Sequence, residues 1–247
     1  MERLHAAQRV IRSLRASIGD LVEGERDQRE QRSFFQRAIV DLTAALRSSV
    51  ADLAEAQAEL VTRLGSVVEY RDDETGAHVR RVGRFSALLA QLAGLDAARC
   101  QLISYASVLH DVGKVAIPDA VLLKPGRLSH EERAVVETHA QIGYEVLKDS
   151  ASEVLQSGAT IAWTHHEKFD GSGYPRGLAG AQIPIEGRIV AIADVYDALS
   201  SDRVYRPAFP PARVREIMVA DRGSHFDPGL LDVFLEEVVD SPSCAPG

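Results

Sequence analysis

Apolar residues recur every three or four positions through the first 65 residues, a stretch without proline. The seam they form comprises a first run and a second run in the same register: Leu4, Ala7, Ile11, Leu14, Ile18 and Leu21, then Phe35, Ile39, Leu42, Leu46, Leu53, Ala56 and Leu60. Between the runs, Glu23–Arg32 places polar residues on the seam. Such spacing is typical of helices that pair through one apolar stripe. We expect residues 1–65 to form a helical extension that dimerises as a coiled coil, with two helices folded back as a hairpin or docked on a domain as the alternative.

From residue 66 onward the helical pattern continues and strand patterns are nearly absent. The predicted helices are Val67–Leu92, Asp96–Val112, Ser129 to about Lys148, Ser152–His165, Gly187–Ser200, Pro211–Val219 and Pro228–Val239. Ser129 and Glu132 form the sequence signature of a capping box at the start of the third helix. Glycines and prolines make the stretch from His166 to Pro184 irregular. The chain is therefore predicted to be an all-α domain, residues 66–247, behind the helical extension.

Composition and charge narrow the classes of function. The formal net charge of -8 falls on residues 66–247, which carry 18 basic and 26 acidic residues, so binding to a nucleic acid polymer is not expected. An anionic substrate stays compatible with this charge if divalent cations are bound. Cys100 and Cys244 lie far apart in the sequence and form no disulfide-like or metal-binding pattern, which suits a reducing cytosol. No apolar run is long enough to span a membrane. We expect a cytoplasmic protein without membrane insertion.

Side chains able to bind metal are distributed over several predicted helices and their ends. They are Glu74, His78, His110, Asp111, His139, His165, His166 and Asp194. Each has an ordinary explanation when taken singly, such as a solvated helix pair, a satisfied core histidine or a buried cap. Their occurrence together, beside apolar residues on separate segments, indicates a metal centre. Nitrogen and oxygen ligands without cysteine favour iron or manganese over structural zinc.

Two motifs carry a resemblance to a known family. His110-Asp111-x-Gly113-Lys114 and His165-His166-Glu-x-x-Asp-Gly-x-Gly-Tyr-Pro175 resemble those of the HD-GYP family of cyclic di-GMP phosphodiesterases, within the HD-domain metallohydrolases. The segments Arg71–His78, Asp194–Arg206 and His225–Pro228 extend the similarity over roughly residues 66–238. The resemblance implies an HD-type helical bundle.

The resemblance also implies roles for individual residues. All eight side chains named above would be metal ligands, and Glu74 favours three divalent metal ions over two. Asp111, His110 and Lys114 would be catalytic, and substrate would be bound by Lys114, Tyr174, Arg203 and Arg206. Lys114 as a solvated lysine and Tyr174 as a packing residue are the structural alternatives, and Asp170 is expected to cap its loop. Val204 departs from the proline that the family often has there.

The predicted reaction is hydrolysis of cyclic di-GMP to linear pGpG by a metal-bridged hydroxide, with onward hydrolysis to GMP open. Three alternatives are a cyclic-dinucleotide sensor with little turnover, an HD phosphohydrolase acting on another nucleotide, and a structural coiled-coil scaffold. The expected partners are cyclic di-GMP, a second copy of the chain through the N-terminal helices, and a signalling protein.

Overall fold

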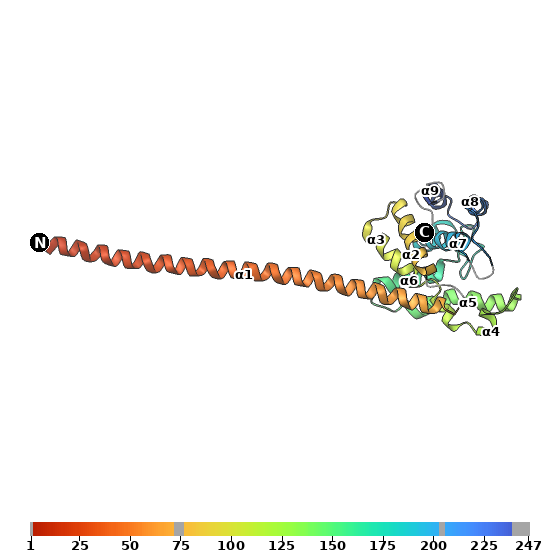
Figure 1. Cartoon of the computed structure of the whole chain (residues 1–247), viewed down its shortest axis with the longest axis horizontal. Coiled ribbons are helices and arrows are strands. Elements are labelled where there is room, and N and C mark those ends of the chain that lie inside the picture. The colour runs from red at the N-terminus through yellow and green to blue at the C-terminus, as the bar shows by residue number, and fades with distance from the viewer. Residues whose placement is uncertain (1, 72–76, 203–205, 239–247) are drawn as a thin grey trace. The chain divides into compact units, whose positions relative to one another are not determined.

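The computed structural model describes residues 2–71, 77–202 and 206–238 (Figure 1). These residues form helices and connecting loops without a strand, so the predicted all-α class is confirmed. The chain divides into two compact units, residues 1–57 and 58–247. Within the described residues, no helix is long and apolar enough to cross a membrane.

The first unit consists of one helical segment, part of α1 (Glu2–Glu69). The helix continues through Glu23–Arg32, which differs from the hairpin alternative, because that alternative needs a break in this stretch. The stretch contains no proline, and a single glycine in a helix costs only about 1 kcal/mol. Seam residues along it, including Leu14, Ile18, Ile39, Leu42 and Leu53, are more than half exposed. Pairing of this seam with a second copy stays a prediction.

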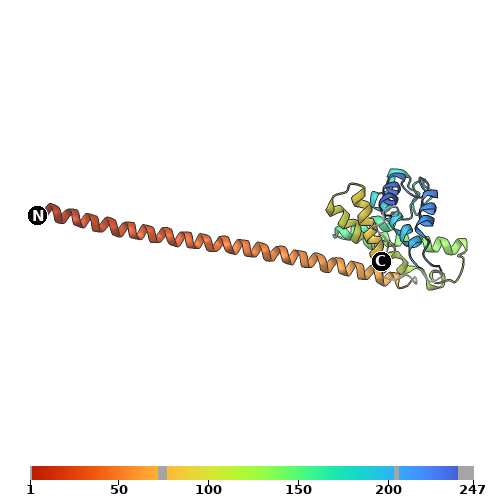
Figure 2. The same ribbon diagram turned by 45° about the horizontal axis from the view of Figure 1, so that its top comes forward.

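The second unit begins with the last turns of α1 and contains all the remaining helices. They are α2 (Ala77–Leu92), α3 (Ala97–Ser107), η1 (Val112–Ala116), α4 (Asp119–Leu122), α5 (His130–Leu147), α6 (Glu153–Thr164), η2 (Gly180–Gln182), α7 (Ile185–Ser200), α8 (Pro211–Ala220) and α9 (Pro228–Val238). Helix α6 packs against α3, α5 and α7, and α2 packs against α3 and α7 (Figure 2). The main core lies among α2, α3, α6, α7, α8 and α9, and its largest buried side chains include Leu89, Ile103, Ile161, Ile192 and Phe234.

The capping box predicted at Ser129 is confirmed. The Ser129 hydroxyl accepts a hydrogen bond from the Glu132 backbone N–H at 3.2 Å, and the Glu132 carboxylate accepts one from the Ser129 N–H at 2.7 Å. These reciprocal bonds satisfy two N–H groups that an α-helix leaves without partners at its start. The capping-box motif therefore predicted the start of α5 correctly.

Two predicted helices are shorter in the structure. The helix predicted over Val67–Leu92 is wrong as one unit: α1 ends at Glu69, a turn includes Arg71, and α2 begins at Ala77. Arg71 leaves the helical path and donates to the backbone carbonyls of Lys114 and Ile117, each at 3.0 Å. The helix predicted over Asp96–Val112 ends at Ser107, so the His-Asp pair lies in the tight turn before η1.

Candidate metal centre

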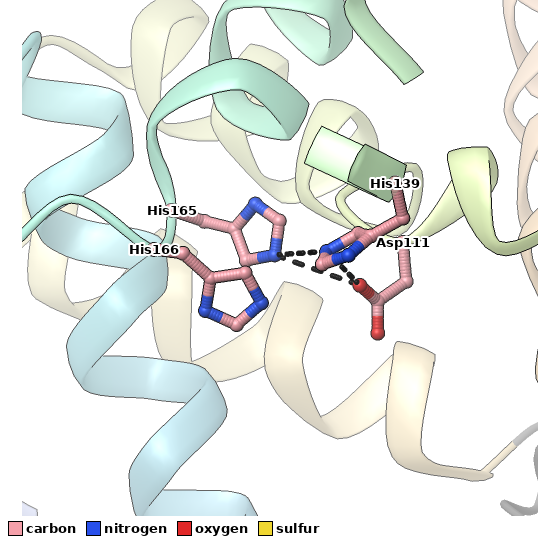
Figure 3. Close-up of side chains that lie close together, drawn as sticks. All are labelled: Asp111, His139, His165 and His166. Carbon is pink, nitrogen blue, oxygen red and sulfur yellow. Dashed lines mark hydrogen bonds and ion pairs between the residues drawn. The ribbon is translucent and has the colours of Figure 1, made fainter. Parts of the chain in front are cut away.

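Four ligand-type side chains meet near the ends of α3 and α6 and the middle of α5 (Figure 3). They are Asp111, His139, His165 and His166, whose nearest ligand atoms all lie within 4.8 Å of one another. Asp111 Oδ1 is 3.2 Å from His139 Nε2 and 3.5 Å from His165 Nε2. The two Nε2 atoms are 3.5 Å apart. The structure thus brings together four of the eight predicted ligands in one group, which we call the Asp111 group.

A second group shares the same region of the domain. Glu69, His78 and His110 are buried, and each offers a ligand atom within 4.8 Å of the others. Asp194 Oδ1 lies 3.4 Å from His78 Nε2 and 3.9 Å from His110 Nε2. His110 Nε2 is also 3.4 Å from Asp111 Oδ2, which links this His110 group to the Asp111 group. Seven of the eight predicted ligands therefore gather at one place, together with Glu69, which sequence reasoning missed.

Backbone carbonyls orient three of the histidine rings. The Nδ1 atoms of His110, His139 and His165 lie 2.8 Å from Ser107 O, 2.7 Å from Val136 O and 3.1 Å from Ile161 O, respectively. A carbonyl can only accept, so each Nδ1 carries a proton and each Nε2 faces the cluster. This is the arrangement that a metal-binding histidine needs. It arises because each histidine follows the accepting residue by three or four positions in its own helix or turn.

Neighbouring charges and burial set the pKa values in the Asp111 group. Burial would raise the pKa of Asp111, but the Lys114 ammonium, 2.7 Å away, and the neighbouring histidines hold that pKa well below its ordinary value. Burial would lower the pKa of His139, yet its interaction with the Asp111 carboxylate outweighs burial and raises the pKa. Burial lowers the pKa of His110 and of His166. The Asp111 carboxylate is therefore ionised beside the neutral rings of His110 and His166, and it favours the protonated form of His139.

The residues fit a divalent metal ion. His110 Nε2 is buried and has no hydrogen-bond partner among the described residues, although a buried polar atom without a partner is costly. Because its ring is neutral and Nδ1 carries the proton, Nε2 presents a lone pair toward Asp111, His78 and Asp194. Imidazole nitrogen and carboxylate oxygen are the ligand types that iron and manganese accept.

Asp197 and Arg81 support the His110 group from outside it. The buried Asp197 carboxylate lies 2.7 Å from His78 Nδ1 and accepts from Arg81 at 2.5 and 3.0 Å. Burial would raise the pKa of Asp197, but the bonds from His78 and Arg81 lower it, so the carboxylate stays ionised. A carboxylate behind a ligand histidine orients the ring and raises its basicity. Sequence reasoning gave Asp197 no role, because it is 119 positions from His78.

The loop after His166 forms one wall beside the Asp111 group. The Tyr174 ring lies 4.7 Å from the His166 ring, centroid to centroid, and burial raises the Tyr174 pKa, so its hydroxyl stays protonated. The buried Glu167 carboxylate accepts from the N–H groups of Arg176 and Leu178 at 2.8 and 2.9 Å, and these bonds tie the two ends of the loop together. A Cβ on Gly173 would meet the His166 carbonyl oxygen at 2.5 Å, so this position needs glycine.

The remaining predicted residues have mixed outcomes. Asp170 caps the loop as predicted, since its carboxylate accepts from the Ser172 N–H at 2.8 Å. The Arg206 guanidinium donates to the carbonyls of Ala198 and Pro207 and lies over the Phe209 ring, and its role in substrate binding stays a prediction. The predicted ligand Glu74, the predicted substrate contact Arg203 and the departure at Val204 lie outside the described residues.

Comparisons with known proteins agree with this architecture. A family model described as HD domain matches residues 50–230. The chain is 47% identical over 197 residues to the 3′3′-cGAMP-specific phosphodiesterase 2 of Vibrio cholerae, covering 80% of this chain and 38% of that protein. It is 42% identical over 224 residues to the cyclic di-GMP phosphodiesterase response regulator RpfG of Xanthomonas campestris, covering 91% of this chain and 58% of the relative. This chain thus spans between about two fifths and three fifths of the length of these relatives.

A solved structure shows the same fold. The crystal structure of a cyclic GMP-AMP-specific phosphodiesterase of V. cholerae superposes with a TM-score of 0.56 at 20% sequence identity, covering 75% of this chain and 49% of that one. At this identity the likeness concerns the fold alone. The matched family model covers most of the present chain, and the His-Asp and Gly-Tyr-Pro motifs lie where the ligand groups meet. The chain belongs to the HD domain family, as a member of its HD-GYP group.

Proposed function

We propose that this chain hydrolyses cyclic di-GMP to linear pGpG in a metal-dependent reaction. The observation that carries the proposal is the meeting of two metal-ligand groups at His110 and Asp111, with Lys114 and Tyr174 beside them. The relatives named as cyclic dinucleotide phosphodiesterases support the same reaction. Turnover of pGpG, supplied as a separate substrate, tests whether the chain also hydrolyses it to GMP.

The proposed cofactors are two or three divalent metal ions, with iron or manganese preferred. The proposed ligands are Glu74, His78, His110, Asp111, His139, His165, His166 and Asp194. Support comes from the convergence of the seven described members and from their nitrogen and oxygen atoms. When bound, such ions supply a Lewis acid for the phosphoryl oxygens and lower the pKa of water. Three ions are favoured over two because, by the family resemblance, a glutamate at the position of Glu74 goes with a three-metal site.

The protein residues then have distinct tasks. Asp111 stays ionised beside Lys114 and offers two oxygens to the site. The Lys114 ammonium, with its side chain only 13% exposed, supplies positive charge for a phosphate oxygen that approaches Asp111. Tyr174, whose ring lies tilted against that of His166, offers an aromatic face and a protonated hydroxyl to the nucleotide. Arg203 is proposed as a second phosphate contact, while Arg206 would have to exchange its carbonyl partners to serve as one.

A second candidate substrate is 3′3′-cGAMP, which differs from cyclic di-GMP in one base. Three of the relatives, including one 47% identical to this chain, are named for that activity. None of the roles proposed above for Asp111, Lys114 and Tyr174 depends on which purine is present. The choice between the two substrates therefore has to come from kinetics.

We also propose that the chain forms a homodimer through α1 and that a signalling protein acts on this helix. Support comes from the seam near the domain: Leu60, Leu64 and Val67 are 63%, 58% and 66% exposed, even though Val61 and Val68 on the adjacent face are buried. An apolar stripe that stays exposed beside a docked face is available for a partner helix.

The test is turnover by protein loaded anaerobically with Fe(II) or Mn(II). Cyclic di-GMP, 3′3′-cGAMP and pGpG are supplied separately, and products are quantified by chromatography. We expect cleavage of cyclic di-GMP by the native chain and its loss in His110→Ala and Asp111→Ala. Full activity in the Asp111 variant contradicts the mechanism, and about one metal ion per chain by mass spectrometry contradicts the multinuclear centre. Binding of cyclic di-GMP without product supports the sensor alternative.

A further inference from the structure

The last two turns of α1 present a buried face to the domain that ends in a carboxylate. Val61, Gly65, Val68 and Glu69 are all buried, at the spacing i, i+4, i+7 and i+8 that defines one helix face. Glu69 is only 1% exposed. Ionised carboxylates are rarely that buried unless they are paired or bind a metal. The position of Glu69 on an otherwise apolar face therefore indicates a specific role.

Glu69 faces the His110 group. Its carboxylate offers an oxygen within 4.8 Å of ligand nitrogens of both His78 and His110. His110 Nε2 is buried, has no hydrogen-bond partner among the described residues and belongs to a neutral ring. Asp194 approaches the same two rings from α7, at 3.4 and 3.9 Å. The two imidazoles thus have a carboxylate from α1 within 4.8 Å and a second carboxylate, from α7, at 3.4 and 3.9 Å. Imidazole nitrogen and carboxylate oxygen are suitable ligands for iron or manganese.

Two further contacts fasten this end of α1 to the segment that carries the metal ligands. Gly65 packs so closely on the Val108 carbonyl that a Cβ there would lie 2.4 Å from its oxygen. Beyond Glu69, Arg71 donates to the carbonyls of Lys114 and Ile117 and forms an ion pair with Asp119 at 2.6 Å. The segment between these anchors, residues 108–117, includes His110, Asp111 and Lys114. A displacement of the end of α1 therefore has to displace these side chains too.

We infer that Glu69 is a metal ligand contributed by the N-terminal helix, completing the position formed by His78, His110 and Asp194. The inference rests on the metal centre of the proposed function and deepens it. It makes the end of α1 part of the centre, so that metal occupancy at this position and the placement of α1 on its domain depend on each other. A signal that shifts α1 would then change metal binding, and metal binding would hold α1 in place.

The first experiment measures metal binding by Glu69→Gln, which keeps the size of the side chain and removes its charge. The matched control is Glu59→Gln, ten residues earlier in α1, where the carboxylate is exposed and pairs with Arg63. After loading with Mn(II) and desalting, we expect Glu69→Gln to lose about one metal ion per chain, or to bind Mn(II) about tenfold more weakly or worse. The control should match the native chain. A Glu69→Gln protein with native metal content and affinity overturns the inference.

A spectroscopic experiment tests direct ligation and does not depend on turnover. Glu69→Cys and the control Glu59→Cys are loaded with Co(II), and the absorbance of each is compared with that of the native chain. A thiolate bound to Co(II) gives a sulfur-to-metal charge-transfer band in the near ultraviolet. We expect that band only in Glu69→Cys. Its absence from a folded protein that holds cobalt, checked by circular dichroism and metal analysis, overturns the inference.

The outcomes separate this inference from the proposed function. If the native chain cleaves no cyclic dinucleotide but Glu69→Gln loses metal, the proposed function fails and the inference stands. If the native chain cleaves cyclic di-GMP and Glu69→Gln keeps its full metal complement, the proposed function stands and the inference fails. If Glu69→Gln does not fold, the cobalt spectrum of Glu69→Cys decides.

Discussion

Replacing Asp197 by asparagine should weaken metal binding without touching a ligand. Asp197 accepts from His78 Nδ1 at 2.7 Å and from two nitrogens of Arg81. An asparagine oxygen that accepts from His78 turns the amide NH2 toward the Arg81 donors. The opposite orientation presents NH2 to His78 Nδ1 and moves the ring proton to Nε2, where a metal has to bind. Each arrangement therefore makes it less favourable for His78 to carry its proton on Nδ1 and present Nε2 to the metal.

The magnitude follows from these contacts. Loss of a carboxylate behind a ligand histidine typically costs about tenfold to about a hundredfold in metal affinity, which is about 1.4 to about 2.7 kcal/mol. Loss of charge-assisted hydrogen bonds from a buried carboxylate should also lower the free energy of unfolding of the metal-free domain by about 1–3 kcal/mol. We expect values below the upper end of both ranges, because the Arg81 side chain is 28% exposed and water can replace part of the hydrogen bonding that it loses.

The assay is a calorimetric Mn(II) titration, with metal content per chain and a denaturant melt of the metal-free protein. Asp232→Asn is the matched control, since Asp232 makes a comparable two-bond pair with Arg222, at 2.8 and 2.7 Å, on the protein surface. We expect that control to bind Mn(II) like the native chain. Native Mn(II) affinity in a folded Asp197→Asn protein would refute the assignment of Asp197 as a positioning residue for His78.

Three further predictions concern the loop, the lysine and pH. Gly173→Ala should destabilise the domain by about 1–3 kcal/mol, because its Cβ would overlap backbone atoms, whereas Gly229→Ala, with 3.5 Å of space, should be neutral in the same melt. Lys114→Met should lower kcat by about a hundredfold or more with metal content retained; unchanged kcat would remove Lys114 from the mechanism. The raised pKa of His139 means that metal must displace a proton held against Asp111, so Mn(II) affinity should strengthen from about pH 6 to about pH 8, and a flat titration would contradict this.

Local patterns in the sequence were sufficient for most of the helices. The capping box at Ser129 predicted the start of α5, because both reciprocal bonds lie within four residues. The same reasoning failed between residues 67 and 92, where apolar periodicity continues across a turn. The turn forms there because Arg71 finds its partners more than 40 positions away, at Lys114 and Ile117. A pattern read along one helix contains no information about such partners.

The metal centre shows the same division. Histidines and carboxylates in compact motifs could be predicted as ligands, and the described ones do gather. The roles given to Glu69 as a ligand and to Asp197 as a positioning residue were not predicted in this way. Glu69 lies outside the motifs, and Asp197, within the segment Asp194–Arg206, has its partner His78 119 positions away. One signal was available for Glu69: it occupies the i+8 position of the face defined by Val61 and Val68. The more prominent exposed seam through Leu60 and Val67 concealed that face.

His78 differs from His110, His139 and His165 in what holds its ring in place. His139 and His165 take their orientation from carbonyls in their own helices, so only unfolding of those helices would disturb them. His78 instead depends on Asp197, 119 positions away, and shares its group with a carboxylate from α1. Side-chain contacts between separate helices respond to small displacements that leave each helix intact. Metal occupancy of the His110 group should therefore vary with the position of the end of α1, while the Asp111 group keeps its metal. The number of metal ions bound per chain then reports the position of that helix end.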